Sequence, residues 1–204
     1  IASCGVEEIE IPTTGDARVI LRTQGIDATA AHLHSGFAGT NGPVVVPLEQ
    51  DSGNSNLWAL LPDTTLDADL ITAILAGGIY FNVHSSTYPS GELRGQVLTG
   101  NVHVFIATPA GLQDVPEPVN STGFARAAVT LNRDTNIAEI HFTSDNIEPF
   151  AAHIHQGAAG TNGPVVIDLS PDPLTSGHWF AEGVEPGNDL IAALDSAGLY
   201  FNLH

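Results

Sequence analysis

Histidines recur at matched spacing in the two halves of this sequence, and they are its best candidates for chemistry. Each half holds a His-x-His pair and a third histidine about 50 residues further on. Positions i and i+2 of a β-strand lie on the same face, so the two rings of a pair can converge on one ion. Copper and zinc favour imidazole nitrogen, and a third ring from another strand would complete a three-nitrogen site. The candidate metal ligands are His32, His34 and His84 in the first half and His153, His155 and His204 in the second.

The segments around these histidines are duplicated as well. Residues 31–45 and 152–166 differ at only three positions, and Tyr-Phe-Asn-x-His ends a second matched segment in each half. Asn82 and Asn202 stand two residues before the third histidine, so we expect them to share its face and to orient a metal ligand. The duplication therefore predicts not only the ligands but also the strands that bring them together.

The same histidines also have a purely structural interpretation. A His-x-His pair can hydrogen-bond across the fold and tie the Asn-Gly-Pro loop to the Asn-x-His strand. A duplicated module would copy structural histidines as faithfully as ligands, so the repeat does not decide between the two. If metal binds, its affinity should fall below about pH 6.5, where protons compete for imidazole. Three further histidines occur once each and are expected at the surface or in local hydrogen bonds: His103, His141 and His178.

Self-similarity over so long a period indicates a tandem duplication of one module. We expect one domain over residues 1–100 and a second over 101–204, with the proline-rich run 108–119 as a stiff linker at the start of the second. Apolar residues alternate with polar or small ones in several short segments separated by Gly, Pro, Asn and Asp, which predicts β-strands. A helix is expected in each module, over 66–76 and 189–194, directly before the strand that carries the third histidine.

These patterns predict an all-β protein of two tandem antiparallel β-sandwiches, Greek-key or immunoglobulin-like, each with one short helix. Counted from the Thr-Gly pairs at 14–15 and 122–123, the first module should lack about one hairpin before its His-x-His. The second stops before any counterpart of residues 89–97. A sheet without its last strand has an open edge, which either a longer chain or a neighbouring molecule would complete.

Composition excludes several classes of partner. The chain has 23 acidic residues, five arginines and no lysine, for a formal charge of -18, so phosphate backbones would be repelled and nucleic acid is not expected. No apolar run is long enough to predict a transmembrane span. Cys4 is the only cysteine, so no intramolecular disulfide can form, and its setting, Ile1-Ala-Ser-Cys4, is typical either of a lipid-anchored cysteine or of a lone thiol near a frayed terminus. The absence of methionine suits a processed product or a fragment of a longer chain.

Three motifs in this sequence together resemble the CHRD domain, the module named after chordin. They are, in order, His-x-His-x-Gly with Asn-Gly-Pro, then Tyr-Phe-Asn-Val-His, then Pro89-Ser-Gly-Glu-Leu-Arg-Gly-Gln96. The resemblance covers nearly all of the chain. It implies a secreted or envelope protein, which we expect to be bacterial and periplasmic or at the cell surface. The leading hypothesis for its function is a structural or binding component rather than an enzyme. Its expected partners are other envelope or extracellular proteins, or further copies joined through the open sheet edge.

The histidine segments are also similar to the copper-binding strands of copper–zinc superoxide dismutase. This second resemblance implies copper ahead of zinc as the cofactor, with His32, His34 and His84 as ligands and Arg94 near the open side. The second repeat has no counterpart of that arginine. Residues 43–83 contain no histidine, so the bridging ligand and the zinc ligands of the dismutase have no equivalent here, and no cysteine pair pins the loops. A copper-dependent, dismutase-like redox protein is therefore the alternative function.

Overall fold

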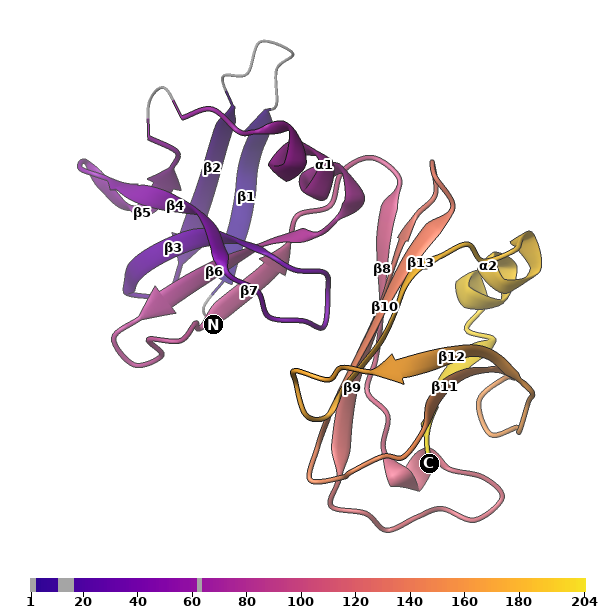
Figure 1. Cartoon of the computed structure of the whole chain (residues 1–204). Helices are drawn as coiled ribbons and strands as arrows, with labels where there is room; N and C mark the ends of the chain where they lie inside the picture. Colours follow the sequence, from indigo (N-terminus) through magenta and orange to yellow (C-terminus); the bar gives the residue numbers. More distant parts are fainter. Residues whose placement is uncertain (1–2, 11–16, 62–63) are drawn as a thin grey trace. The chain divides into compact units, whose positions relative to one another are not determined.

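The structure of the chain is a computed structural model that describes the backbone of residues 3–10 and the whole of residues 17–61 and 64–204. Both halves are built mainly of antiparallel strands, and the chain divides into two compact units near Gly100 (Figure 1). The predicted all-β class with one short helix in each repeat is confirmed. No helix in the described residues is long and apolar enough to cross a membrane.

Unit one contains a single sheet of seven strands in the order β1-β2-β5-β4-β3-β6-β7. The strand β4 pairs with β3 on one side and with β5 on the other, so it joins two layers of a sheet that curls over on itself. The curl brings the edge strands β1 and β7 near one another. The strands are β1 (Ser3–Glu10), β2 (Arg18–Gln24), β3 (Ala28–Ser35), β4 (Val44–Asp51), β5 (Asn54–Ala59), β6 (Ile79–Ser85) and β7 (Leu93–Gln96).

Unit two repeats this arrangement in the order β8-β9-β10-β13-β12-β11-β14. Its strand β11 carries the second His-x-His and lies between β12 and β14, as β3 lies between β4 and β6. A short 3-10 turn, η1 (Gly111–Gln113), interrupts the proline-rich segment before β9. The strands are β8 (Val102–Ala107), β9 (Phe124–Asn132), β10 (Ile137–Asp145), β11 (Ala152–Gln156), β12 (Val165–Pro171), β13 (His178–Val184) and β14 (Leu199–Leu203).

Matching the two sheets shows how the described strands of the repeats differ: β9 and β10 correspond to β1 and β2. The predicted missing hairpin was counted from residues 14–15, which lie outside the described residues, so it stays a prediction. Within the described residues, repeat one lacks only a counterpart of β8, and repeat two lacks only a counterpart of β7. Each difference is one edge strand.

Each helix begins close to the predicted position. Helix α1 (Ala68–Ala76) is capped by Asp67, whose carboxylate accepts a hydrogen bond from the Leu70 N–H at 2.7 Å. It ends at Gly77, which has the left-handed conformation that favours glycine there. Helix α2 (Asn188–Asp195) follows its N-cap Gly187 and begins at the residue before the predicted range. Both helices pack on the core of their own sheet and lead into β6 or β14.

Alternation along the strands places the core on one face of each curled sheet. In β2 every second residue is buried, and in β10 Ile140 and Phe142 lie in the core while His141 faces the other way. Full burial of a side chain such as Leu33 or Phe81 stabilises the fold by about 1.5–3 kcal/mol. Leu33 separates the two histidines of the first pair, so burying it in the core turns both imidazoles to the opposite face of β3.

Candidate metal centre

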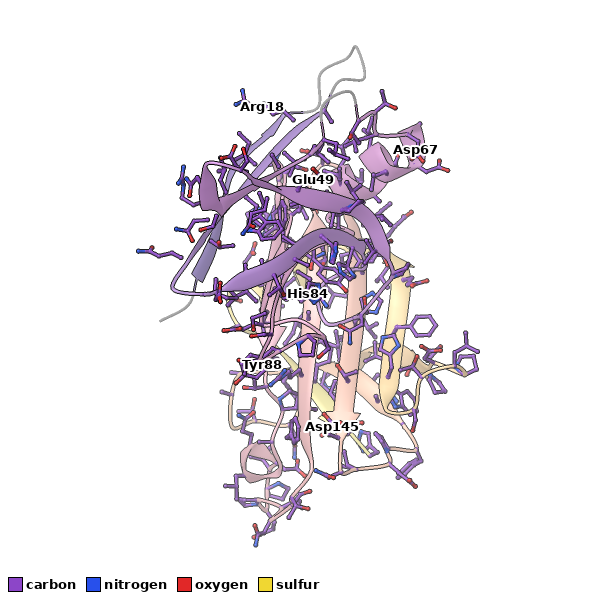
Figure 2. The ribbon with its side chains drawn as sticks, turned by 90° about the vertical axis from the view of Figure 1, so that its left-hand side faces the viewer. Arg18, Glu49, Asp67, His84, Tyr88 and Asp145 are labelled. Carbon is purple, nitrogen blue, oxygen red and sulfur yellow. The ribbon has the colours of Figure 1, made fainter. Side chains whose placement is uncertain are left out.

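Three histidine side chains from two neighbouring strands meet on that opposite face in repeat one. His32 and His34 lie on β3, and the pairing of β3 with β6 brings His84 beside them. One ligand nitrogen from each ring lies within 4.8 Å of the others. His32 Nδ1 is 3.0 Å from His84 Nε2, a side chain labelled in Figure 2. The sequence-predicted trio is therefore brought together, and it could hold a metal ion.

Hydrogen bonds fix which nitrogen of each ring faces the cluster. His34 Nδ1 donates to the carbonyl oxygen of Gly42 at 2.9 Å, and His84 Nδ1 donates to that of Pro89 at 3.0 Å. Each ring then has its lone pair on Nε2. The Nε2 of His34 is buried and has no hydrogen-bond partner. Metal-bound histidines commonly donate their second ring nitrogen to a carbonyl in this way, which orients the ring and fixes the tautomer.

The loop that contains Gly42 lies unusually close to β3. A Cβ atom on Gly42 would lie 1.6 Å from the carbonyl oxygen of Ser35, so only glycine fits. The Gly42 N–H donates to the Tyr80 hydroxyl at 3.2 Å, and the Tyr80 ring stacks on His34 at 5.0 Å between centroids. His34 therefore does tie the Asn-Gly-Pro loop to β6, as the structural interpretation predicts, while its other nitrogen faces the cluster.

Repeat two reproduces this arrangement. His155 Nδ1 donates to the carbonyl of Gly163 at 2.9 Å, Tyr200 stacks on His155, and the Tyr200 hydroxyl accepts from the Gly163 N–H at 3.1 Å. The Nε2 of His155 is again buried without a hydrogen-bond partner. His204, the residue that follows β14, supplies the third ring, and the three ligand atoms lie within 4.8 Å of one another.

A β-bulge stands opposite each His-x-His pair. In repeat one His32 pairs with Pro47 and Leu33 with Val46, but His34 pairs with Val44, so β4 contains one extra residue. The register of β11 on β12 shifts at the equivalent place. Bulges bend a strand and increase its local twist, and they are common beside functional sites. The extra residue lies on β4 or β12, so the bend falls on the strand beside each His-x-His pair.

The two clusters differ at their first histidine. In repeat two Asp168 takes the position of Pro47, and its carboxylate lies 3.5 Å from His153 Nε2. This favours a proton on Nε2 and leaves the lone pair on Nδ1, which is buried and has no hydrogen-bond partner. His32 has proline at that place, and its Nδ1 faces His84 instead. His153 thus has its Nε2 beside a carboxylate, whereas the Nδ1 of His32 is occupied by His84.

One ring in each cluster has a lowered pKa. Burial, then the neighbouring His84 and His34, lower the pKa of His32. Burial and the rings of His153 and His155 also lower the pKa of His204, against a smaller opposing effect of Asp114. Imidazole must be unprotonated to bind a metal, so lowered pKa values favour the ligand form near neutral pH.

The remaining predicted site residues have separate places. Asn82 pairs with His32 across the β3–β6 ladder, and Asn202 pairs with His153, so both lie beside the clusters. The guanidinium of Arg94, on β7, lies 3.5 Å from the centre of the Tyr80 ring and makes a cation–π contact with it. The backbone of Cys4 is in β1, but its side chain lies outside the described residues, so its lipidation stays a prediction.

Sequence reasoning missed the two tyrosines and the two loop glycines, although the signal was present. Tyr80, Asn82 and His84 alternate along β6, which places the tyrosine on the face of the third histidine. Asp168 could not be found in this way, because it stands outside the duplicated segments and depends on strand pairing.

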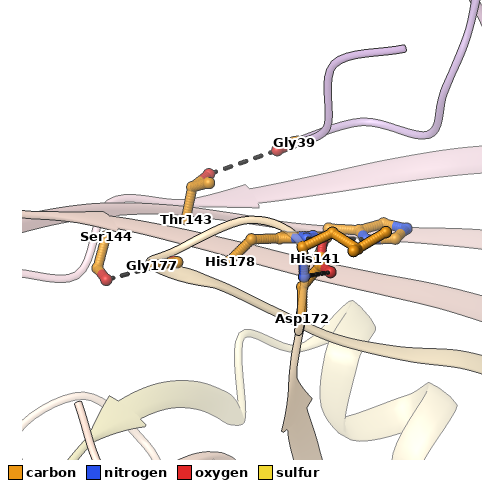
Figure 3. A network of polar contacts seen from close by, with 8 residues as sticks. Gly39, His141, Thr143, Ser144, Asp172, Gly177 and His178 are labelled. Carbon is orange, nitrogen blue, oxygen red and sulfur yellow. Dashed lines mark hydrogen bonds and ion pairs between the residues drawn. The ribbon is translucent and has the colours of Figure 1, made fainter. Parts of the chain in front are cut away.

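A second histidine group was also missed and occurs in repeat two alone. His178 Nδ1 donates to Asp172 Oδ2 at 2.9 Å, and His178 Nε2 lies 3.2 Å from His141 Nδ1 (Figure 3). His178 is bonded locally as predicted and His103 is exposed as expected, but His141 is buried and its partner is distant in the sequence. The hydrogen bonds from His178 and Leu174 lower the pKa of Asp172 to about 2. Burial and then His178 lower the pKa of His141 to about 4.

We expect this group to make repeat two sensitive to acid. The folded pKa of His141 is lowered, so the unfolded chain binds more protons than the folded one between about pH 6.5 and 4, and stability falls as pH falls through that window. The full loss is up to about 3 kcal/mol. Replacing His141 by isoleucine, the residue at the matching position 20, should flatten this dependence. Denaturation followed by Trp179 fluorescence in a Trp58→Phe background measures it, and an unchanged slope would contradict the assignment.

Fold and site together define a class: tandem all-β modules, each with a three-histidine group on the outer face of one strand pair. A family model for the CHRD domain matches residues 5–97 and 105–204. The chain therefore belongs to the CHRD family and contains two tandem CHRD domains. A search of curated proteins found no match. The resemblance to the dismutase stays a prediction.

Proposed function

We propose that this chain is a non-enzymatic module protein of the cell exterior or envelope whose two CHRD domains each bind one copper ion through three histidines. Binding or structural roles are what its family membership favours, and the copper sites add a defined chemistry to the modules. The ligand atoms would be His32 Nδ1, His34 Nε2 and His84 Nε2 in repeat one. In repeat two they would be His153 Nδ1, His155 Nε2 and a ring nitrogen of His204.

The observation that carries the proposal is that the same nitrogen of the second histidine, Nε2, is buried without a hydrogen-bond partner in both repeats. Nε2 of His34 and Nε2 of His155 both face their cluster, and both rings are fixed in that orientation by a glycine carbonyl. A buried polar atom that makes no hydrogen bond destabilises a fold by about 1–3 kcal/mol. A purely structural histidine would gain from using both nitrogens. A bound ion satisfies the second nitrogen in both repeats.

The donor set favours copper over zinc. Three neutral imidazoles bind Cu²⁺ more tightly than Zn²⁺ in the usual order of metal affinities. The 3.0 Å separation of His32 Nδ1 and His84 Nε2 corresponds to an angle of roughly 95° at an ion with bonds of about 2.0–2.1 Å. That angle suits the tetragonal geometry of Cu²⁺ better than a zinc tetrahedron.

Metal analysis of the whole chain tests the proposal. We expect two copper ions per molecule, with nitrogen hyperfine structure in the electron paramagnetic resonance spectrum from three imidazoles at each. Zinc in equimolar competition should not displace them. Protein that takes up no copper, or that binds it equally well after all six histidines are replaced, would show that the rings are structural.

A redox function is the second candidate, and one observation favours it. His32 and His84 are only partly buried, so an ion held by the three rings would have a coordination position open to a small molecule. Superoxide turnover by the copper-loaded protein, absent from a variant that has lost both sites, would replace the non-enzymatic proposal. Copper binding without turnover supports the leading one.

Asp168 should make the two sites unequal. The carboxylate favours the Nδ1 ligand tautomer of His153, so Asp168→Asn is expected to weaken copper binding in repeat two by about tenfold, within the usual range for groups that orient a ligand. The matched variant is Pro47→Asp, which should strengthen copper binding in repeat one. Isothermal titration of each variant resolves the two affinities. If the copper affinity of each repeat is the same in the unmodified chain and in both variants, the role of Asp168 is contradicted, while the copper sites remain.

A further inference from the structure

The two histidine clusters offer the same donors but have different charged neighbours. In both repeats the second histidine has its Nδ1 on a glycine carbonyl and a tyrosine ring stacked on it. At the first histidine the repeats differ, because Asp168 Oδ1 lies 3.5 Å from His153 Nε2 in repeat two. The residue paired with His32 at the equivalent place is Pro47, which carries no charge. A negative charge therefore lies beside this candidate ligand in repeat two alone.

A second carboxylate acts on the third histidine of repeat two. Burial and then the two other rings of the cluster lower the pKa of His204, and Asp114, at the end of the η1 turn, opposes them. In repeat one the pKa of His32 is lowered by burial and then by the other two rings of its cluster, with no contribution from a carboxylate. Two of the three candidate ligands in repeat two thus have a negative neighbour.

A carboxylate beside a ligand ring favours the more highly charged form of a bound copper ion. Cu²⁺ has one more positive charge than Cu⁺, so a nearby negative charge stabilises the oxidised ion more than the reduced one. A carboxylate held against the second nitrogen of a ligand imidazole also makes that ring a stronger donor, and proteins set reduction potentials through such groups. The side chain of Asp168 is 86% exposed, so water and salt screen its charge, and the effect should be moderate.

We propose that the two copper sites differ in redox state: repeat one is reduced to Cu⁺ at potentials at which repeat two still holds Cu²⁺. Each reduction adds one electron to one ion from an external one-electron donor, and no bond of the protein is broken. His32 and His84 are only partly buried, so a small donor can reach the cluster that accepts the first electron. This inference rests on the proposed copper binding and deepens it, because the two domains then form a graded pair of sites.

A redox titration of the whole chain, loaded with two Cu²⁺ ions and followed by electron paramagnetic resonance, tests the proposal. We expect the Cu²⁺ signal to disappear in two steps of one ion each. The steps should be separated by about a tenfold difference in the ratio of Cu²⁺ to Cu⁺, which is about 59 mV for a one-electron couple. His34→Ala should retain only the step at lower potential, and His155→Ala should retain only the other.

Variants of the charged neighbour test the cause of the difference. Asp168→Asn should move the step at lower potential towards the other, and Pro47→Asp should lower the potential of repeat one. The matched control is Asp189→Asn, which removes the same charge from an exposed residue of α2 and should leave both steps in place.

Three results would overturn the proposal: a single step for both ions, reduction of repeat two before repeat one, or two steps that neither Asp168→Asn nor Pro47→Asp moves. Metal analysis of the same sample comes first and separates these results from a failure of the proposed function. A chain that binds no copper loses the proposed function and this inference together. A chain that binds two ions of equal potential loses only the inference.

Discussion

His34→Ala is expected to reduce copper binding from two ions per molecule to one, because it removes a ligand whose second nitrogen is fixed by the Gly42 carbonyl. Loss of a group that only orients a ligand usually weakens binding by 10–100-fold, so the loss of a ligand should weaken repeat one by at least about 100-fold. Titration monitored by electron paramagnetic resonance measures it. His155→Ala should do the same in repeat two.

The matched control is His103→Ala, an exposed histidine outside both clusters. It should keep two copper ions and unchanged affinities. If His34→Ala also keeps two, the imidazoles do not bind the ion and the proposed function is wrong.

Gly163→Ala is expected to destabilise repeat two by about 2–4 kcal/mol, because its Cβ would lie 1.7 Å from the carbonyl oxygen of Gln156 and the loop would have to move away. The same movement withdraws the carbonyl that orients His155, so copper affinity should fall together with stability. Gly42→Ala should act in the same way on repeat one, where the contact is with Ser35.

Gly187→Ala supplies the control in the same repeat. No atom lies within 4 Å of its Cβ position, so the only expected cost is that of alanine at the N-cap of α2, below about 1 kcal/mol. Chemical denaturation of the two variants gives the comparison. Equal stability of Gly163→Ala and Gly187→Ala would contradict the close approach of loop and strand.

Much of the fold was predictable, because the alternation of apolar residues indicates strands and the duplication of the sequence indicates two similar domains. Alternation predicted several short strands, and the helix predicted over 66–76 agrees with α1 to within two residues. Which edge strand each repeat has beyond the shared six was not predictable, because that assignment depends on strand pairing between distant segments of the described residues.

The clusters were predictable in membership but not in chemistry. Spacing alone placed His32 and His34 on one face and His84 on a partner strand. It could not assign Nδ1 or Nε2, because that choice depends on the carbonyls of Gly42 and Pro89, which reach the rings through tertiary contacts. Asp168 and the group around His141 could not be predicted either, because they also depend on tertiary contacts.

The buried Nε2 atoms of His34 and His155 have a consequence for the lifetime of the protein. Under the copper proposal, each empty site leaves one acceptor unsatisfied, so the metal-free domain unfolds more often than the loaded one. An ion present at about 100 times its Kd would add roughly 2.7 kcal/mol to a domain. Proteases that attack the unfolded chain would then degrade the two forms at different rates, and abundance would follow the supply of metal.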